Sequence, residues 1–159
     1  MKKFISMLLV LVLIFVIASN VYASENPSSE NYRFIQYTIY DSNNNIKDII
    51  TVDTFLRYAS DPIRLGVNEK VTVKPLGEDG FYISNNTRVT ILNHARGEGM
   101  NRRTIVYGDY NYSVNEMLRM ESDMQKQNRS FTAKNYGRYW VEVRNLSSKT
   151  IEFSVGVNY

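Results

Sequence analysis

The sequence predicts a mainly β fold: a single β-sandwich or jelly-roll-like domain with about eight short antiparallel strands and one short helix near residues 114–125. Two observations predict it. Apolar and polar residues alternate with a period of two over much of the chain after residue 32, the spacing of strands that bury one face. Asn, Gly and Pro bound these short runs. There is no cysteine, so packing must hold the sheets together in place of disulfides.

The first two strands are predicted to form a hairpin. Ile35, Tyr37 and Ile39 share one face of the run 33–40, and a second run covers 46–52. Between them lies a stretch of Ser and Asn, and Asn tolerates the left-handed conformation that tight hairpin turns require.

Further strands are predicted in the middle of the chain. In the run 70–74, Val71 and Val73 share a face, and Pro75 ends the run because proline cannot donate to a strand ladder. Two short runs, 80–84 and 88–93, are joined by an Asn-Asn pair, and another run covers 103–107.

One segment predicts a helix. Ser113 and Glu116 have the spacing of a capping box, in which each side chain bonds the backbone amide of the other residue. Val114, Met117, Leu118 and Met124 follow at helical spacing, so a helix is expected from 114 to 125.

The closing segments, 139–144 and 151–159, alternate most clearly and predict a final hairpin. Pairing Val143 with Phe153 would place Arg144 opposite Glu152 and Trp140 over Gly156. That register is favoured because a slip of two residues would set two glutamates opposite each other.

The amino terminus has the pattern of a cleavable signal peptide over residues 1–23. Lys2 and Lys3 precede the apolar run 7–17, and Val21 and Ala23 suit a cut after Ala23. Residues 24–31 are polar and predict a flexible leader, and residues 32–159 are expected to form the sandwich. The protein is therefore expected to be a secreted bacterial protein with no membrane span after cleavage.

Removal of the signal peptide changes the charge balance. The signal holds two of the 19 Lys and Arg and none of the 16 Asp and Glu, so 17 basic and 16 acidic residues remain. This balance gives no reason to expect nucleic acid as a partner, because nucleic-acid binding needs a concentrated basic surface.

No motif for catalysis, a metal or a cofactor is present. The chain has one histidine, His94, and no cysteine, which is a poor ligand supply for zinc. Asp41, Asn43 and Asn45 copy the start of a calcium loop, but Ile46 and Val52 occupy the positions that require glycine and glutamate. No catalytic residue, metal site or cofactor is therefore predicted.

Two groups of residues are candidates for binding. Tyrosines combined with an acid and a tryptophan offer large apolar rings with polar tips, which suit sugar or peptide ligands. These residues are Tyr107, Asp109, Tyr110, Tyr112 and Trp140. The second group, Arg96, Arg102 and Arg103, flanks a glycine-containing loop and could bind an anion; the simpler interpretation is a solvated loop.

The function that fits these features is a secreted, non-catalytic module that binds an envelope polymer, a protein partner or a second copy of itself. One alternative is a small secreted hydrolase that uses a pair of carboxylates. A second alternative is a small outer-membrane β-barrel, because the last nine residues alternate and end on an aromatic residue.

Overall fold

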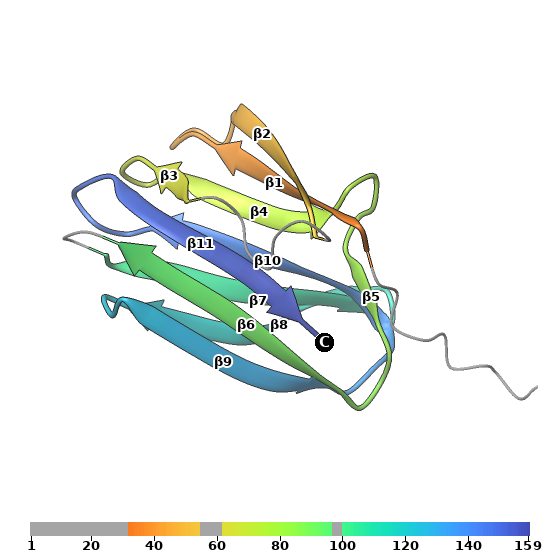
Figure 1. Ribbon diagram of the computed structural model, residues 1–159. Coiled ribbons are helices and arrows are strands. Elements are labelled where there is room, and N and C mark those ends of the chain that lie inside the picture. Colours follow the sequence, from red (N-terminus) through yellow and green to blue (C-terminus); the bar gives the residue numbers. More distant parts are fainter. Residues whose placement is uncertain (1–31, 55–61, 97–99) are drawn as a thin grey trace, which may run out of the picture.

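The structure is a computed structural model that describes residues 32–54, 62–96 and 100–159 (Figure 1). The predicted signal peptide and leader lie outside these ranges. Within them, no helix has the length and hydropathy needed to span a membrane.

The described chain forms a two-layered antiparallel β-sandwich, which confirms the predicted fold class (Figure 1). The larger sheet has the strand order β2-β1-β4-β10-β7-β8, with β5 also paired to β10, and the smaller has the order β3-β11-β6-β9. The strands are β1 (Phe34–Tyr40), β2 (Ile46–Asp53), β3 (Ile63–Leu65), β4 (Lys70–Pro75), β5 (Phe81–Ile83), β6 (Thr87–Arg96), β7 (Arg102–Tyr110), β8 (Ser113–Ser122), β9 (Lys126–Ala133), β10 (Gly137–Asn145) and β11 (Ile151–Asn158).

The hydrophobic core lies between the two sheets and is built by period-two alternation. Every second residue of β10 from Gly137 to Asn145 is buried, and the residues between them are half-buried. Strand β11 contributes Ile151, Phe153 and Val155, all nearly inaccessible to solvent. Each of these two strands therefore presents one face to the core and the other outward.

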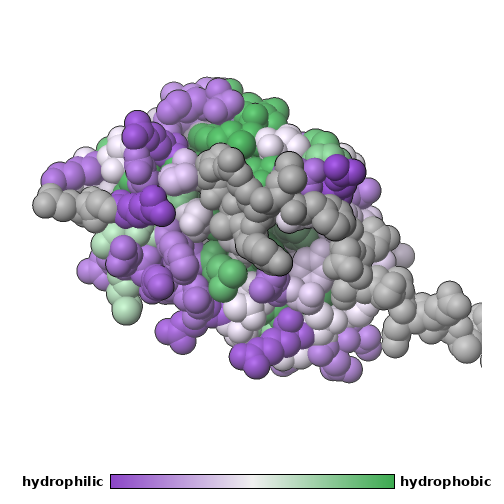
Figure 2. Space-filling model, in the orientation of Figure 1, coloured by the Kyte–Doolittle hydropathy of each residue, from purple (hydrophilic) through white to green (hydrophobic). Residues whose placement is uncertain are grey.

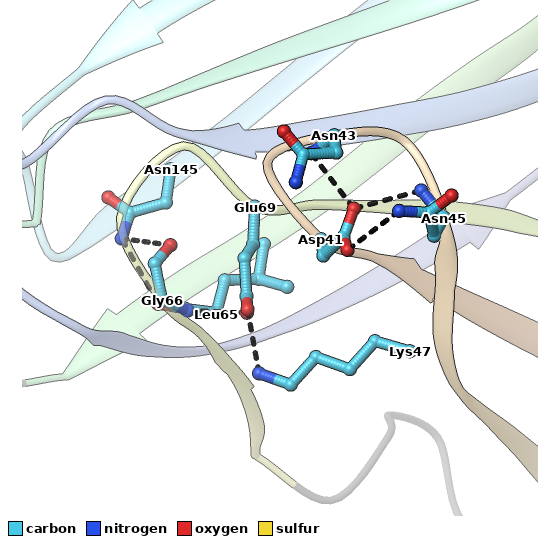
Figure 3. A network of polar contacts seen from close by, with 8 residues as sticks. All are labelled: Asp41, Asn43, Asn45, Lys47, Leu65, Gly66, Glu69 and Asn145. Atoms are coloured by element: carbon cyan, nitrogen blue, oxygen red, sulfur yellow. Dashed lines mark hydrogen bonds and ion pairs between the residues drawn. The ribbon is translucent and has the colours of Figure 1, made fainter.

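The predicted first hairpin is confirmed. Strands β1 and β2 pair in register, with Tyr37 opposite Ile50. At the turn, Asn44 adopts a φ of 65°, and the Asp41 carboxylate accepts hydrogen bonds from the backbone amides of Asn43 and Asn45 at 2.8 Å each (Figure 3). Asn therefore serves here as the sequence pattern predicts.

The predicted helix over 114–125 is wrong: Ser113–Ser122 is strand β8, paired with β7. The register shifts between Val106 and Tyr107, where Tyr107 lies opposite Glu116 and Val106 lies opposite Leu118. Met117 is thus an extra residue, a β-bulge, which shifts the alternation by one position. Glu116 and Arg119 consequently share a face although they are three residues apart, which reproduces a helical spacing.

The predicted closing hairpin is also wrong. Strand β10 pairs with β4, β5 and β7 in the larger sheet, whereas β11 pairs with β3 and β6 in the smaller one. Val143 therefore does not pair with Phe153. Two adjacent strands that bury one face each satisfy the same alternation whether they pair edge to edge or face each other across a core.

The connection between β10 and β11 is held by Asn145. Its amide donates to the carbonyl oxygens of Leu65, Gly66 and Lys149 at 3.0, 2.9 and 2.8 Å. Figure 3 shows Asn145 beside Leu65 and Gly66, with Glu69 of the same turn reaching Lys47. The polar groups of this crossing are thus satisfied where the chain leaves one sheet for the other.

Candidate binding face

The outward face of the larger sheet carries two of the candidate aromatic residues, Tyr107 and Trp140. Trp140 lies on the central strand β10, directly opposite Tyr107 of β7. On the other side of β10 runs β4, with Lys74 near the same level. We call the outward-facing group Lys70, Thr72, Lys74, Ile105, Tyr107, Arg138, Trp140 and Glu142 the Trp140 face.

The Trp140 ring is held between side chains of the two flanking strands. The centroids of the Trp140 and Tyr107 rings are 5.5 Å apart, with an interplanar angle of 24°, so the rings stack. The Lys74 ammonium lies over the indole, 5.7 Å from its centroid, within the range of a cation–π interaction. This row fixes the tryptophan side chain before any ligand arrives.

The Tyr107 hydroxyl lies in an unusual electrostatic setting. Burial raises the pKa of Tyr107, and the negative charges of Glu142 and Glu116 raise it further. The phenol consequently remains protonated and available as a hydrogen-bond donor throughout the physiological range.

The centre of the face is covered by its own long side chains. Thr72 and Ile105 point away from the core, yet they are only 9% and 6% exposed. Glu142 lies between them in the register and forms ion pairs with Lys70 at 3.2 Å and with Arg144 at 3.9 Å. The alkyl stems of these charged residues thus cover the outward side of the sheet while their charged ends remain hydrated.

Asp109 also faces this side, but its carboxylate already forms an ion pair. Its carboxylate contacts the guanidinium of Arg138, which also reaches Asp79 at 3.2 Å. A hydrogen bond from Arg138 to Asp109 and the negative charge of Asp109 raise the pKa of Arg138. Next to Arg138, Tyr82 stacks on Tyr136 with ring centroids 6.2 Å apart.

The two other candidate tyrosines do not join the face. Tyr110 is half-buried, and its hydroxyl donates to the Met117 sulfur at 3.6 Å. Tyr112 is fully exposed in the β7–β8 turn, where Asn111 and Tyr112 have φ angles of 53° and 59°. Of the five predicted residues, the structure brings together Tyr107, Asp109 and Trp140.

The three candidate anion-binding arginines are not brought together either. Arg96 is exposed at the end of β6, and Arg103 pairs with Glu121 on the outward side of the larger sheet at 2.5 Å. The loop residues 97–99 between them lie outside the described ranges.

Arg102 lies inside the sandwich with no exposed surface. Its guanidinium donates to the side-chain oxygen of Asn93 at 2.7 Å and to the carbonyl oxygens of Met100 and Met124 at 3.0 Å each. Burial lowers the pKa of Arg102. The buried guanidinium thus has a structural role, tying β7 to β6 and to the β8–β9 turn.

Sequence reasoning missed six of the eight residues of the Trp140 face, among them Lys74, Arg138 and Glu142. That these side chains point outward could be predicted from the alternation within β4 and β10. Their proximity, however, depends on β10 pairing with β4 and β7. Within the described residues, no cluster of three or more His, Asp or Glu could hold a metal ion. His94 is half-buried on β6, opposite Ser154 and Lys126.

No family model matches the sequence, and no curated protein matches it significantly. Among solved structures, the N-terminal cellulose-binding domain of Cellulomonas fimi β-1,4-glucanase C is similar, with 12% identity over 77% of this chain and 87% of that chain and a TM-score of 0.48. A structure titled "CBM4 structure and function" has 12% identity over 77% and 93% of the chains, with a TM-score of 0.46. The pre-peptidase C-terminal domain of a Bacillus anthracis collagenase has 16% identity over 59% and 91%, with a TM-score of 0.41. At these identities the likeness concerns the fold.

Proposed function

We propose that this chain is a secreted, non-catalytic binding module whose Trp140 face contacts an extended partner, an envelope polymer or the surface of a protein. Export is proposed from the signal-peptide pattern of residues 1–23. The observation that carries the binding role is the row of Lys74, Trp140 and Tyr107 across three strands. This fixed aromatic pair lies on a face that none of the other described strands covers.

Such a row suits recognition for two reasons. The aromatic rings offer a large contact area at low entropic cost because their neighbours already restrict them. The surrounding ammonium, hydroxyl and carboxylate groups offer hydrogen bonds that orient a ligand along this row. An extended ligand fits this arrangement because the row continues across adjacent strands.

Trp140 makes the test direct, because it is the only tryptophan in the chain. Residues 24–159 would be incubated with purified cell-wall polymer, in intact and solubilised form, and tryptophan emission and retention on the polymer would be measured together. We expect retention accompanied by a shift of the emission. Tyr107→Ala should weaken binding by at least tenfold, since an aromatic hot spot at the centre of a contact contributes about 2 kcal/mol or more, and about 1.4 kcal/mol corresponds to tenfold.

A matched control is Tyr112→Ala, which removes a fully exposed tyrosine away from the face. It should bind like the unaltered chain. The proposal fails if Tyr107→Ala binds with unchanged affinity, or if the chain is retained while the Trp140 emission stays constant.

The hydrolase alternative gains no support at this face. Asp109, Glu116 and Glu142 are each paired with a cation. A hydrogen bond from Arg119 lowers the pKa of Glu116, whereas a catalytic general acid needs a raised pKa. The binding role is therefore the one we retain.

A further inference from the structure

Positive charge is concentrated on the smaller sheet. Its four strands contain Arg64, Arg88, Arg96, Lys126 and Arg129 against a single acid, Glu152. The chain after residue 23, by contrast, has 17 basic and 16 acidic residues. The fold thus gathers a local positive charge that overall composition conceals.

Four of these cations project from the outward side of the sheet. In β6 the buried residues alternate with Arg88, Thr90, Leu92, His94 and Arg96, which therefore point outward. Lys126 lies opposite His94, and Arg64 lies opposite Glu152, so both share that side. We call Arg64, Arg88, Arg96 and Lys126 the basic face; all four are exposed.

Most of this charge is available to a partner. Arg64 forms an ion pair with Glu152 at 2.5 Å. For Arg88, Arg96 and Lys126, no carboxylate within the described part of the chain lies close enough for an ion pair. Unpaired guanidinium and ammonium groups on one surface attract anions at long range and bind carboxylate or sulfate groups on contact.

Small polar groups fill the space between the cations. Thr90 and Ser130 lie opposite each other with their hydroxyl oxygens 2.8 Å apart, and Ser154 lies opposite His94. Figure 2 views the molecule from this side, and hydrophilic residues dominate its lower part, where β6 and β9 run. Arg88 and Arg96 are eight residues apart on one strand, so this polar strip extends for about 27 Å.

We propose that the basic face is a second binding site, which takes an anionic polysaccharide. The hydroxyl side chains match the hydroxyl groups of a sugar chain, and the cations match its carboxylate or sulfate groups. Nucleic acid fits less well, because Phe131 and Phe153 belong to the core and the face offers no aromatic ring for base stacking. A lipid surface also fits less well, because Leu92 is the one apolar side chain at an outward position of β3, β6, β9 and β11, the described strands of the smaller sheet.

The test uses residues 24–159 with dextran sulfate, polygalacturonate and neutral dextran, with affinities measured by calorimetry at low and moderate salt. We expect binding to one or both anionic glycans that weakens as salt rises, and none to neutral dextran. The two anionic probes distinguish sulfate from carboxylate recognition. The variant Arg96→Gln/Lys126→Gln should bind about tenfold more weakly, because it removes two charge-assisted contacts.

The matched control is Arg103→Gln/Arg119→Gln, which changes the net charge equally but lies on the larger sheet. It should alter the affinity less than twofold, with folding of both variants checked by circular dichroism. The proposal is overturned if the control weakens binding as much as the test variant, or if neutral dextran binds equally. Tighter binding to single-stranded DNA or to phosphatidylglycerol vesicles would also overturn it. Tyr107→Ala should leave this binding intact, which separates the basic face from the Trp140 face.

Discussion

Tyr112 is a residue in a conformation that its side chain disfavours. It has a φ of 59° with its side chain fully exposed. A left-handed backbone costs an L-residue about 1–2 kcal/mol, whereas glycine adopts it freely. Since Tyr112 buries nothing that would be lost, Tyr112→Gly should raise the free energy of unfolding by about 1 kcal/mol in urea denaturation. Tyr112→Ala keeps the strain and should change stability little; a gain of similar size there would contradict the explanation.

Arg102, in contrast, is a buried charged residue whose hydrogen bonds stabilise the interior. Arg102→Met would keep an apolar stem but leave Asn93 Oδ1 and the carbonyl oxygens of Met100 and Met124 without this donor. We expect a loss of about 3 kcal/mol in the free energy of unfolding, because buried acceptors would lose their partners. Arg103→Met, one residue along and half-exposed, should cost less than about 1 kcal/mol. Equal losses for the two variants would refute the structural role of Arg102.

At the scale of elements, the β1–β2 hairpin depends on the ionised Asp41. Hydrogen bonds from the Asn45 side chain and backbone lower the pKa of Asp41 below its ordinary value of 3.8. A carboxylate with a lowered folded-state pKa stabilises the fold above its unfolded pKa, and this contribution disappears as the pH falls through the folded value. The unaltered chain should therefore melt at a higher temperature than Asp41→Asn at pH 7, with the difference shrinking in acid below about pH 3.9.

The control for this hairpin is Glu78→Gln, at an exposed loop position. Among the described residues, no hydrogen bond to the Glu78 carboxylate is present, so removing this charge should change the melting temperature little. A difference between Asp41→Asn and the unaltered chain that stays constant from pH 7 to strong acid would show that the charge of Asp41 is not what stabilises the turn.

The elements also show where sequence reasoning succeeds and where it stops. The β1–β2 hairpin was predictable because its turn residues and its alternation are local features. Strand β8 was not predictable, because the bulge at Met117 interrupts the two-residue alternation and gives the outward residues around it the spacing of a helix. The aromatic group was found only in part, because Lys74 and Glu142 approach Trp140 and Tyr107 through strand pairings between distant segments.

At the scale of the whole molecule, alternation predicted a sandwich but not which strands share a sheet. The segments 139–144 and 151–159 each bury one face, and this holds for paired strands and for strands that face each other. A polar side chain distinguishes the two cases here. Asn145 of β10 donates hydrogen bonds to the carbonyl oxygens of Leu65 and Lys149 where the chain crosses to the smaller sheet. This feature is a single amide side chain, which cannot be recognised from the pattern of hydrophobic residues.

Two other polar links join the sheets through the core at separate places. The Tyr37 hydroxyl of β1 donates to the Val155 carbonyl of β11 at 3.0 Å, and Arg102 of β7 binds Asn93 of β6. Tyr37→Phe should lower the free energy of unfolding by about 1 kcal/mol, the usual net value of one hydrogen bond. Because the two links share no residue, its effect and that of Arg102→Met should add to within about 0.5 kcal/mol. Urea denaturation of the two single variants and the double variant measures this sum. A double variant that loses clearly more or less than the sum would mean that the links act as one cooperative network across the core.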